Sequence, residues 1–210
     1  HIPYISCELF SSLFCYCFFV FYYSVKDLVA QQEKLHPYNG VGCFNDMDML
    51  IVGMHGKGNV GLAGCSDVQY QTHYALWAFL GSPLMIGCDI REMSDETRRI
   101  LMNDEMIRIN QDPLCRQPYK VKNHAWNDKV LIYVKALADG DLAIGMFNLS
   151  DEKSRAAMNL DEIGLPFSTG RTLELTEVWT CENLCANNAS LVTELEPFAS
   201  KVYRAKVVKL

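Results

Sequence analysis

The sequence has no excess of basic residues and no run of like charges. Its 19 Lys and Arg residues stand against 25 Asp and Glu residues, which gives a formal net charge of −6. Nucleic-acid-binding domains usually carry clustered basic charge, so this balance argues against a nucleic-acid partner. Only 21% of the residues are charged and 50% are hydrophobic, so a sizeable core can form and wholesale disorder is excluded.

The nine cysteines lack the spacing of a disulfide framework, and their odd number leaves at least one thiol outside any intramolecular pairing. Most stand alone in apolar or glycine-rich surroundings, which predicts buried small hydrophobes. Cys181 and Cys185 would bind a metal only with two further ligands that the sequence does not identify, and His73 has no His or Glu partner one helical turn later. We therefore expect no metal and no cofactor.

Residues 1–23 form an apolar leader that does not match the rest of the chain. No charged residue occurs from Leu9 to Val25, yet the bulky Phe- and Tyr-rich run has neither a basic start nor a small-residue cleavage site. It only marginally reaches the roughly 20 apolar residues of a membrane helix. Its residue types have T-rich codons, which favours a segment that is not native coding sequence. A membrane or signal segment and a core strand are the alternatives, and a membrane partner is expected only if residues 9–25 are a genuine segment.

Residues 24–115 have the pattern of a parallel α/β unit. Apolar segments 41–54 and 82–90 read as buried strands, and helical periodicity predicts helices over 24–35, 67–81 and 94–110. Asp67 or Ser66 is the expected N-cap of the second helix, Gly81 its end, and Ser94 the expected cap of the third. Strand, loop and helix in that repeated order are typical of parallel sheets. A complete (β/α)8 barrel needs ~250 residues, so this region can only be the C-terminal portion of one.

Residues 116–210 predict an antiparallel β-sandwich. After Pro113 the helical period gives way to short alternating apolar runs that are separated by turn residues, with Asp139-Gly140 as the strongest hairpin signal. The expected fold is therefore α/β plus all-β, with the end of a TIM barrel followed by a β-sandwich domain.

Three carboxylates are candidates for chemistry at the barrel mouth, where polar residues at strand ends line active sites. Asp46 and Asp48 are two residues apart, so on an extended backbone they share a face and could bind neighbouring sugar hydroxyls. A bracing role in the turn is the alternative for Asp46. Asp89, followed by Arg91, reads as a structural ion pair.

At GCFNDMDML, ALWA, SPLMIGCDIR and INQDP, in that order along the chain, the sequence resembles the melibiase family of retaining α-galactosidases and α-N-acetylgalactosaminidases. The resemblance covers residues 24–210 and implies a (β/α)8 barrel followed by an antiparallel β-domain. It also implies galactose-containing oligosaccharides or glycoconjugates as substrates, no cofactor, and possible homodimerisation at full length. Asp48 and Met49 match the family's galactose-contacting dipeptide. Phe44 and Met47 replace its usual Trp and Pro without removing a polar contact.

Both catalytic aspartates of the family precede the helix matched by SVKDLV, where this sequence has Glu8 as its only carboxylate. A retaining mechanism needs a nucleophile and an acid/base, so we expect this chain alone to be inactive. The alternatives are a non-catalytic carbohydrate-binding or structural β-domain remnant, and a membrane-anchored fragment. Exposed strand edges would make the chain aggregate or leave only residues 116–210 folded.

Overall fold

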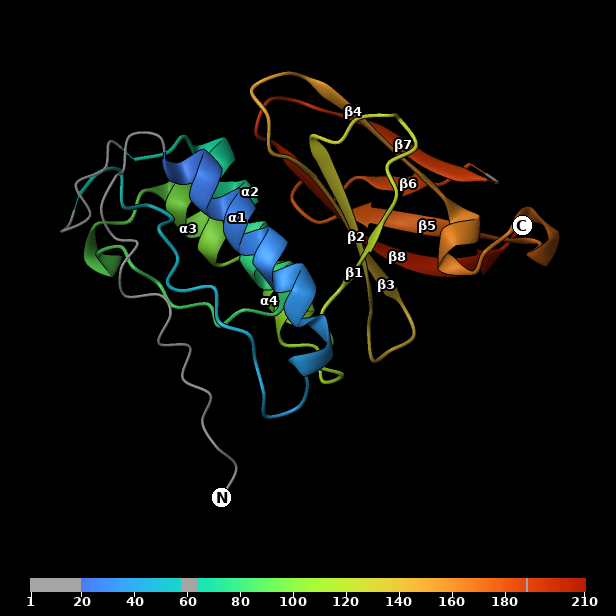
Figure 1. Cartoon of the computed structure of the whole chain (residues 1–210), viewed down its shortest axis with the longest axis horizontal. Helices are drawn as coiled ribbons and strands as arrows, with labels where there is room; N and C mark the ends of the chain where they lie inside the picture. Colours follow the sequence, from blue (N-terminus) through green and yellow to red (C-terminus); the bar gives the residue numbers. More distant parts are fainter. Residues whose placement is uncertain (1–19, 58–63, 188) are drawn as a thin grey trace.

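The computed structural model describes residues 20–57, 64–187 and 189–210, with a helical part on one side and a β part on the other (Figure 1). Its helices are α1 (Val20–Leu35), α2 (Asp67–Leu80), α3 (Asp95–Leu101) and α4 (Asp104–Asn110). Short 3-10 turns cover His36–Tyr38, Ile90–Glu92, Leu160–Ile163 and Phe167–Thr169. Of the predicted leader, residues 1–19 lie outside the described residues. Among those described, no helix has both the length and the hydropathy that a membrane span needs.

Helix α1 begins four residues earlier than the sequence predicted, because neither Gly nor Pro interrupts residues 20–24. Helix α2 has the predicted ends. The Ser66 hydroxyl accepts a hydrogen bond from the Gln69 amide in a capping box, and Gly81 ends the helix with a left-handed backbone (φ 77°). Ten of its residues are buried, which makes α2 the central helix of the molecule.

The single helix predicted over 94–110 is wrong, because Asn103 divides it into α3 and α4. The Asn103 side chain accepts a hydrogen bond from the Met106 amide at 2.9 Å, so it caps a new helix rather than continuing the old one. The predicted cap at Ser94 is confirmed by its bond from the Thr97 amide at 3.1 Å.

The two predicted buried strands, 41–54 and 82–90, do not form as strands. Within the described ranges their one parallel pairing is Leu50 with Ile86, in which the Leu50 amide donates to the Met85 carbonyl at 2.7 Å. An isolated pair of strands is marginal unless further strands or a packed face support it. The described residues give these segments only each other.

The β part contains a six-stranded antiparallel sheet in the order β1-β2-β3-β8-β5-β6 and a two-stranded sheet of β4 and β7. The strands are β1 (Tyr119–Val121), β2 (Val130–Ala136), β3 (Leu142–Asn148), β4 (Ser154–Asn159), β5 (Arg171–Glu177), β6 (Asn183–Cys185), β7 (Ser190–Leu195) and β8 (Ser200–Lys209). The hairpin at Asp139-Gly140 is confirmed, since it joins β2 to β3. Strands β1 and β6 were not predicted, because three residues are too few to show alternation.

The large sheet is buried on both faces, and each face has its own core. On one face Tyr133, Phe147 and Val202 pack in the same cluster as Phe79 of α2. On the other face Ile132, Ile144 and Met146 pack in a cluster with residues of β4 and β7. The sheet is therefore a middle layer between the helical part and the small sheet.

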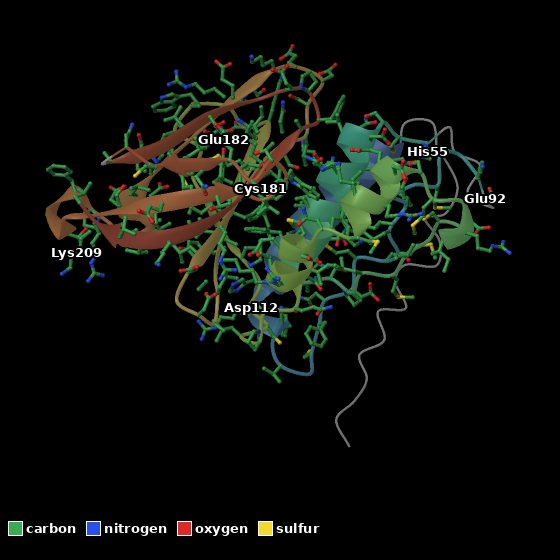
Figure 2. All side chains as sticks on the ribbon, turned by 180° about the vertical axis from the view of Figure 1, so that it is seen from behind. His55, Glu92, Asp112, Cys181, Glu182 and Lys209 are labelled. Carbon is green, nitrogen blue, oxygen red and sulfur yellow. The ribbon has the colours of Figure 1, made fainter. Side chains whose placement is uncertain are left out.

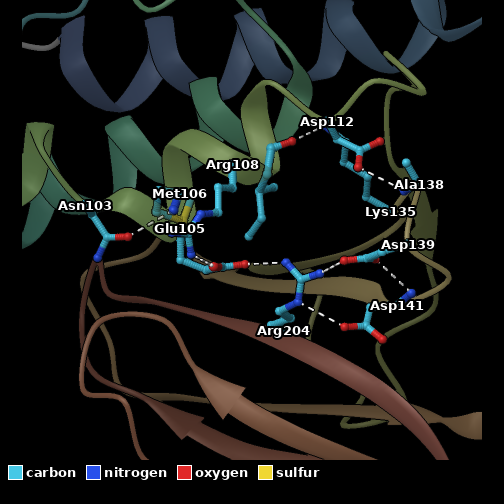
Figure 3. Close-up of polar contacts among 11 residues, drawn as sticks. Asn103, Glu105, Met106, Arg108, Asp112, Lys135, Ala138, Asp139, Asp141 and Arg204 are labelled. Atoms are coloured by element: carbon cyan, nitrogen blue, oxygen red, sulfur yellow. Dashed lines mark hydrogen bonds and ion pairs between the residues drawn. The ribbon is translucent and has the colours of Figure 1, made fainter.

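Arg204 of β8 forms the main charged link between the two parts (Figure 3). It donates to Glu105 of α4 at 2.6 Å and to Asp141 at 3.0 Å, and it also pairs with Asp139. Burial would lower the pKa of this guanidinium, but the hydrogen bonds that it donates to Glu105 and Asp141 raise that pKa well above its usual range. Arg204 thus fastens helix α4 to the β2–β3 hairpin.

The prediction of buried cysteines is wrong for the described ones. Cys43, Cys181 and Cys185 are exposed, and Cys65, Cys88 and Cys115 are partly buried, all six as free thiols. Cys181 stands at an outward-facing turn of the β part (Figure 2), where its φ of 58° places it in a loop rather than in a strand. Local sequence shows that a cysteine has apolar neighbours, but not which way its own side chain faces.

Candidate functional site

The segment Asn45–Met49 forms a tight turn rather than an extended strand. Asp48 has a left-handed backbone (φ 74°), and its amide donates to the Asp46 carboxylate at 2.9 Å. The Asp48 carboxylate in turn accepts from the Met49 amide at 2.6 Å. The expectation that both carboxylates share one face of an extended backbone is therefore wrong. Asp46 braces the turn, as the alternative interpretation held, and an Asp tolerates the left-handed conformation better than most residues do.

Two side chains of helix α2, four residues apart, form hydrogen bonds to the backbone in and beside this turn. The Trp77 indole donates to the Asp48 carbonyl at 2.8 Å, and the His73 Nε2 accepts from the Ile51 amide at 3.2 Å. The two rings are in contact, with centroids 4.0 Å apart. Burial lowers the pKa of His73 to about 3, so the imidazole stays neutral and can accept this bond.

The second apolar segment closes the other side of the turn. The Ser82 hydroxyl accepts from the Met47 amide at 2.9 Å, which fixes Met47 in the core. Gly87 lies so close to the turn that a Cβ atom there would be 2.6 Å from the Leu50 carbonyl and 3.1 Å from the Met49 sulfur. Any larger residue at position 87 would displace Met49 or break the pairing with Leu50.

The result is a rigid turn that presents a carboxylate and a thioether outward. Asp48 is exposed and Met49 is 44% exposed, although the backbone of both is fixed by hydrogen bonds. A carboxylate accepts paired hydrogen bonds from neighbouring hydroxyl groups, and a thioether offers an apolar contact. Such a pair can recognise the two sides of a sugar ring. Among the described residues the one parallel pairing is at Leu50, which comes after Asp48 in the chain. Asp46 and Asp48 therefore precede the paired residue, whereas the sequence pattern predicted them at the end of a strand.

Asp89 does not have the properties of a catalytic acid. Arg91 donates to both of its oxygens, at 2.9 and 2.6 Å, which confirms the predicted ion pair. Hydrogen bonds from the Arg91 side chain and amide lower the pKa of Asp89, whereas a general acid needs a raised one. In the described part of the chain, no three His, Cys, Asp or Glu side chains are grouped to hold a metal ion.

The residues that position the turn were not found from sequence. His73 and Trp77 are spaced four apart in a helix, which puts both on one face, but the same spacing is typical of core residues. Ser82 and Gly87 lie in a segment that reads as a buried strand. The sequence shows that an apolar helix follows the Asn45–Met49 segment, but it does not show which side chains of that helix point toward the segment.

Comparison with known families gives two matches that together span most of the chain. Residues 20–112 match the model described as alpha galactosidase A, and residues 127–205 match the alpha galactosidase C-terminal beta sandwich domain. An α-galactosidase of Cyamopsis tetragonoloba is 29% identical over 86% of this chain and 41% of its own length. Alpha-galactosidase A of Cellvibrio japonicus is 39% identical over 62% of this chain and 29% of its own length. The chain thus spans about 40% of the first of these relatives and less of the second.

Solved structures agree in fold. A Bacteroides fragilis protein described as an α-galactosidase/melibiase superposes with a TM-score of 0.77 at 33% identity, over 87% of this chain and 38% of that one. The raffinose complex of an α-galactosidase from Saccharomyces cerevisiae gives a TM-score of 0.72 at 18% identity, over 88% and 51% of the two chains. Because both family matches follow one another as barrel and β-sandwich, the chain belongs to the melibiase family of α-galactosidases.

Proposed function

We propose that this chain is part of a retaining α-galactosidase, which removes terminal α-linked galactose from oligosaccharides or glycoconjugates. The observation that carries the proposal is the Asn45–Met49 turn, whose backbone is fixed by Trp77 and His73 while the Asp48 carboxylate is exposed. A side chain that is presented on a fixed backbone is suited to binding, because little freedom remains to be lost.

In this proposal Asp48 accepts hydrogen bonds from galactose hydroxyls, and Met49 packs against the apolar side of the ring. Asp46 supports them through its bond to the Asp48 amide and lies close enough in sequence to reach the same sugar. Removing Asp48 would leave buried sugar hydroxyls without a partner, which costs more than the loss of one exposed bond.

The reaction also needs a nucleophile and an acid/base. None of the three candidate carboxylates is placed as a reactive acid: Asp46 braces the turn, Asp48 faces outward beside it, and Asp89 is paired with Arg91. We therefore propose that residues 24–210 form one wall of the pocket, and that both reactive acids come from other residues of a full-length enzyme.

The test joins residues 24–210 to the preceding barrel half of the Cyamopsis tetragonoloba enzyme and measures hydrolysis of a chromogenic α-galactoside. We expect turnover by the chimera, none by the 210-residue chain, and a loss of about 100-fold or more in kcat/KM for D48N. The matched control is D151N, an exposed aspartate of the β part.

A chimera that folds and turns over with D48N as active as the parent would remove Asp48 from the pocket. Turnover by the 210-residue chain itself, lost in D48N, would show that the reactive acids lie within it. If the chimera does not fold, calorimetry of the chain with galactose decides. Loss of one bound galactose per chain in D48N supports the proposal, and a stoichiometry that D48N leaves unchanged contradicts it.

A further inference from the structure

The β part carries an unusually exposed tryptophan. Trp126, in the loop between β1 and β2, is 89% exposed, whereas Trp77 is 2% exposed in the core. Trp126 also has a left-handed backbone (φ 57°), which is rare for a bulky residue. Both features are costly unless they have a use, and strain of this kind is concentrated at binding sites.

The loop that carries Trp126 is firmly held rather than loose. The Asn123 amide donates to the Asn127 carbonyl at 3.0 Å, and its Oδ1 accepts from the Ala125 and Ala157 amides, each at 3.0 Å. The His124 amide donates to the Ala157 carbonyl at 2.7 Å. The loop is thereby fastened to strand β4 on one side and closed on itself on the other. The indole is displayed at a defined place.

The surroundings of the ring are concave, and polar side chains stand among apolar ones. The ring borders an open groove of about 630 Å³ that is also lined by Lys122, Asn127 and Asp128. The Lys122 ammonium lies 5.4 Å from the ring centroid, so a cation–π contact fixes the tilt of the ring. Asn127 uses its Oδ1 to accept from the Lys129 amide at 2.9 Å, and its NH2 group can still donate two hydrogen bonds to a ligand. Asp128 is exposed beside it.

We infer that Trp126 is the platform of a second saccharide-binding site, separate from the Asp48 turn. One face of a pyranose ring stacks on the indole, and its hydroxyls bond to the Asn127 amide and the Asp128 carboxylate. An aromatic surface with a few polar groups at its rim is the usual make-up of a site for such a ligand. We expect the sugar to contain galactose, and for this identity the inference rests on the proposed function.

The test titrates raffinose into the 210-residue chain carrying D48N, which removes the proposed galactose contact at the barrel turn, with isothermal titration calorimetry as the readout. We expect saturable binding, and for D48N/W126A an affinity reduced by about tenfold or more. The matched control is D48N/F167A, which removes another exposed aromatic of the β part and should retain the affinity.

Asn127 provides a second variant. N127L in the same D48N background should weaken the binding without changing the circular dichroism of the free chain. An affinity that W126A leaves unchanged, or an absence of binding to the D48N chain, overturns the site; binding to the parent chain that D48N abolishes would place raffinose at the barrel turn and leave the proposed function standing. A W126A variant whose only difference is reduced self-association in sedimentation also overturns the site, because Trp126 would then be a contact between copies.

Discussion

The helical part and the β part differ in how completely their apolar segments are paired into strands and buried. In the β part, Ile144 lies in a seven-residue strand that is paired on both edges, and it is fully buried. In the helical part, Ile86 has a comparable apolar neighbourhood in sequence, but it forms one bridge and remains 48% exposed. The same kind of residue in the same kind of segment is core in one part and surface in the other. An alternating apolar pattern in sequence therefore gives a strand only where neighbouring strands can pair with it. Among the described residues, such neighbours are present in the β part and nearly absent from the helical part.

The comparison also explains why the candidate site is well formed although its barrel segments are not. The Asp48 turn depends on α2, and α2 shares a core with the large sheet through Phe79 and Phe147, whose rings are 5.9 Å apart. The turn is thus stabilised indirectly by the β part. The segments 41–44 and 85–90 lack such support and leave Val41, Phe44, Met85 and Ile90 exposed.

The largest contrast should come from matched isoleucine truncations. Ile144→Ala removes a fully buried side chain from the core between the two sheets and should lower the free energy of unfolding by about 2–5 kcal/mol. Ile86→Ala removes a half-exposed side chain and should change it by less than ~0.5 kcal/mol. Urea unfolding followed by circular dichroism measures both. Equal effects would show that the two segments are packed alike.

The next contrast concerns acid. Burial holds the pKa of His73 near 3, below the 6.5 of an unfolded chain. The unfolded state therefore binds a proton that the folded state does not, so stability is full above pH 6.5 and falls below it, at a limiting rate of ~1.4 kcal/mol per pH unit. We expect thermal melts between pH 6.5 and 5 to show this decline, and H73Q to flatten it.

Lys135 of the β part gives no such slope in that window. Burial lowers its pKa to about 8 from 10.5, so its own loss of stability takes place as the pH falls from 10.5 to 8 and is complete above neutrality. An acid-dependent decline that H73Q leaves in place would assign it to other groups.

The smallest contrast is between two arginine pairs. Arg204 is only 26% exposed and joins α4 to the β2–β3 hairpin, so R204M should destabilise the chain by about 1 kcal/mol. Arg91 pairs with Asp89 at the surface of a single part, so R91M should give no measurable change in the melting temperature. If R91M lowers the melting temperature more than R204M does, the Arg204 ion pairs between the two parts do not contribute more to stability than a surface ion pair.

Local signals predicted the elements that local chemistry specifies. Ser66 and Gly81 gave the ends of α2, Asp139-Gly140 gave its hairpin, and Asp89 with Arg91 gave an ion pair, because each needs only residues within one turn or one helix. The prediction erred where distant partners decide. Asn103 caps a helix that periodicity alone extends, and the left-handed backbone of Asp48 follows from bonds to Asp46 and Trp77. At the site, Asp48 and Met49 could be named from sequence, while the supporting roles of His73 and Ser82 required their contacts across α2.

Amide hydrogen exchange tests the central claim most directly, namely that the barrel segments need partners that the β part does not. It compares the 210-residue chain with the same residues joined to the preceding barrel half of a relative. We predict fast exchange at Leu50 and Gly87 in the chain alone, slow exchange at the same amides once joined, and slow exchange in β3 and β8 throughout. Leu50 and Gly87 amides that are as protected as those of β3 in the chain alone would contradict the account.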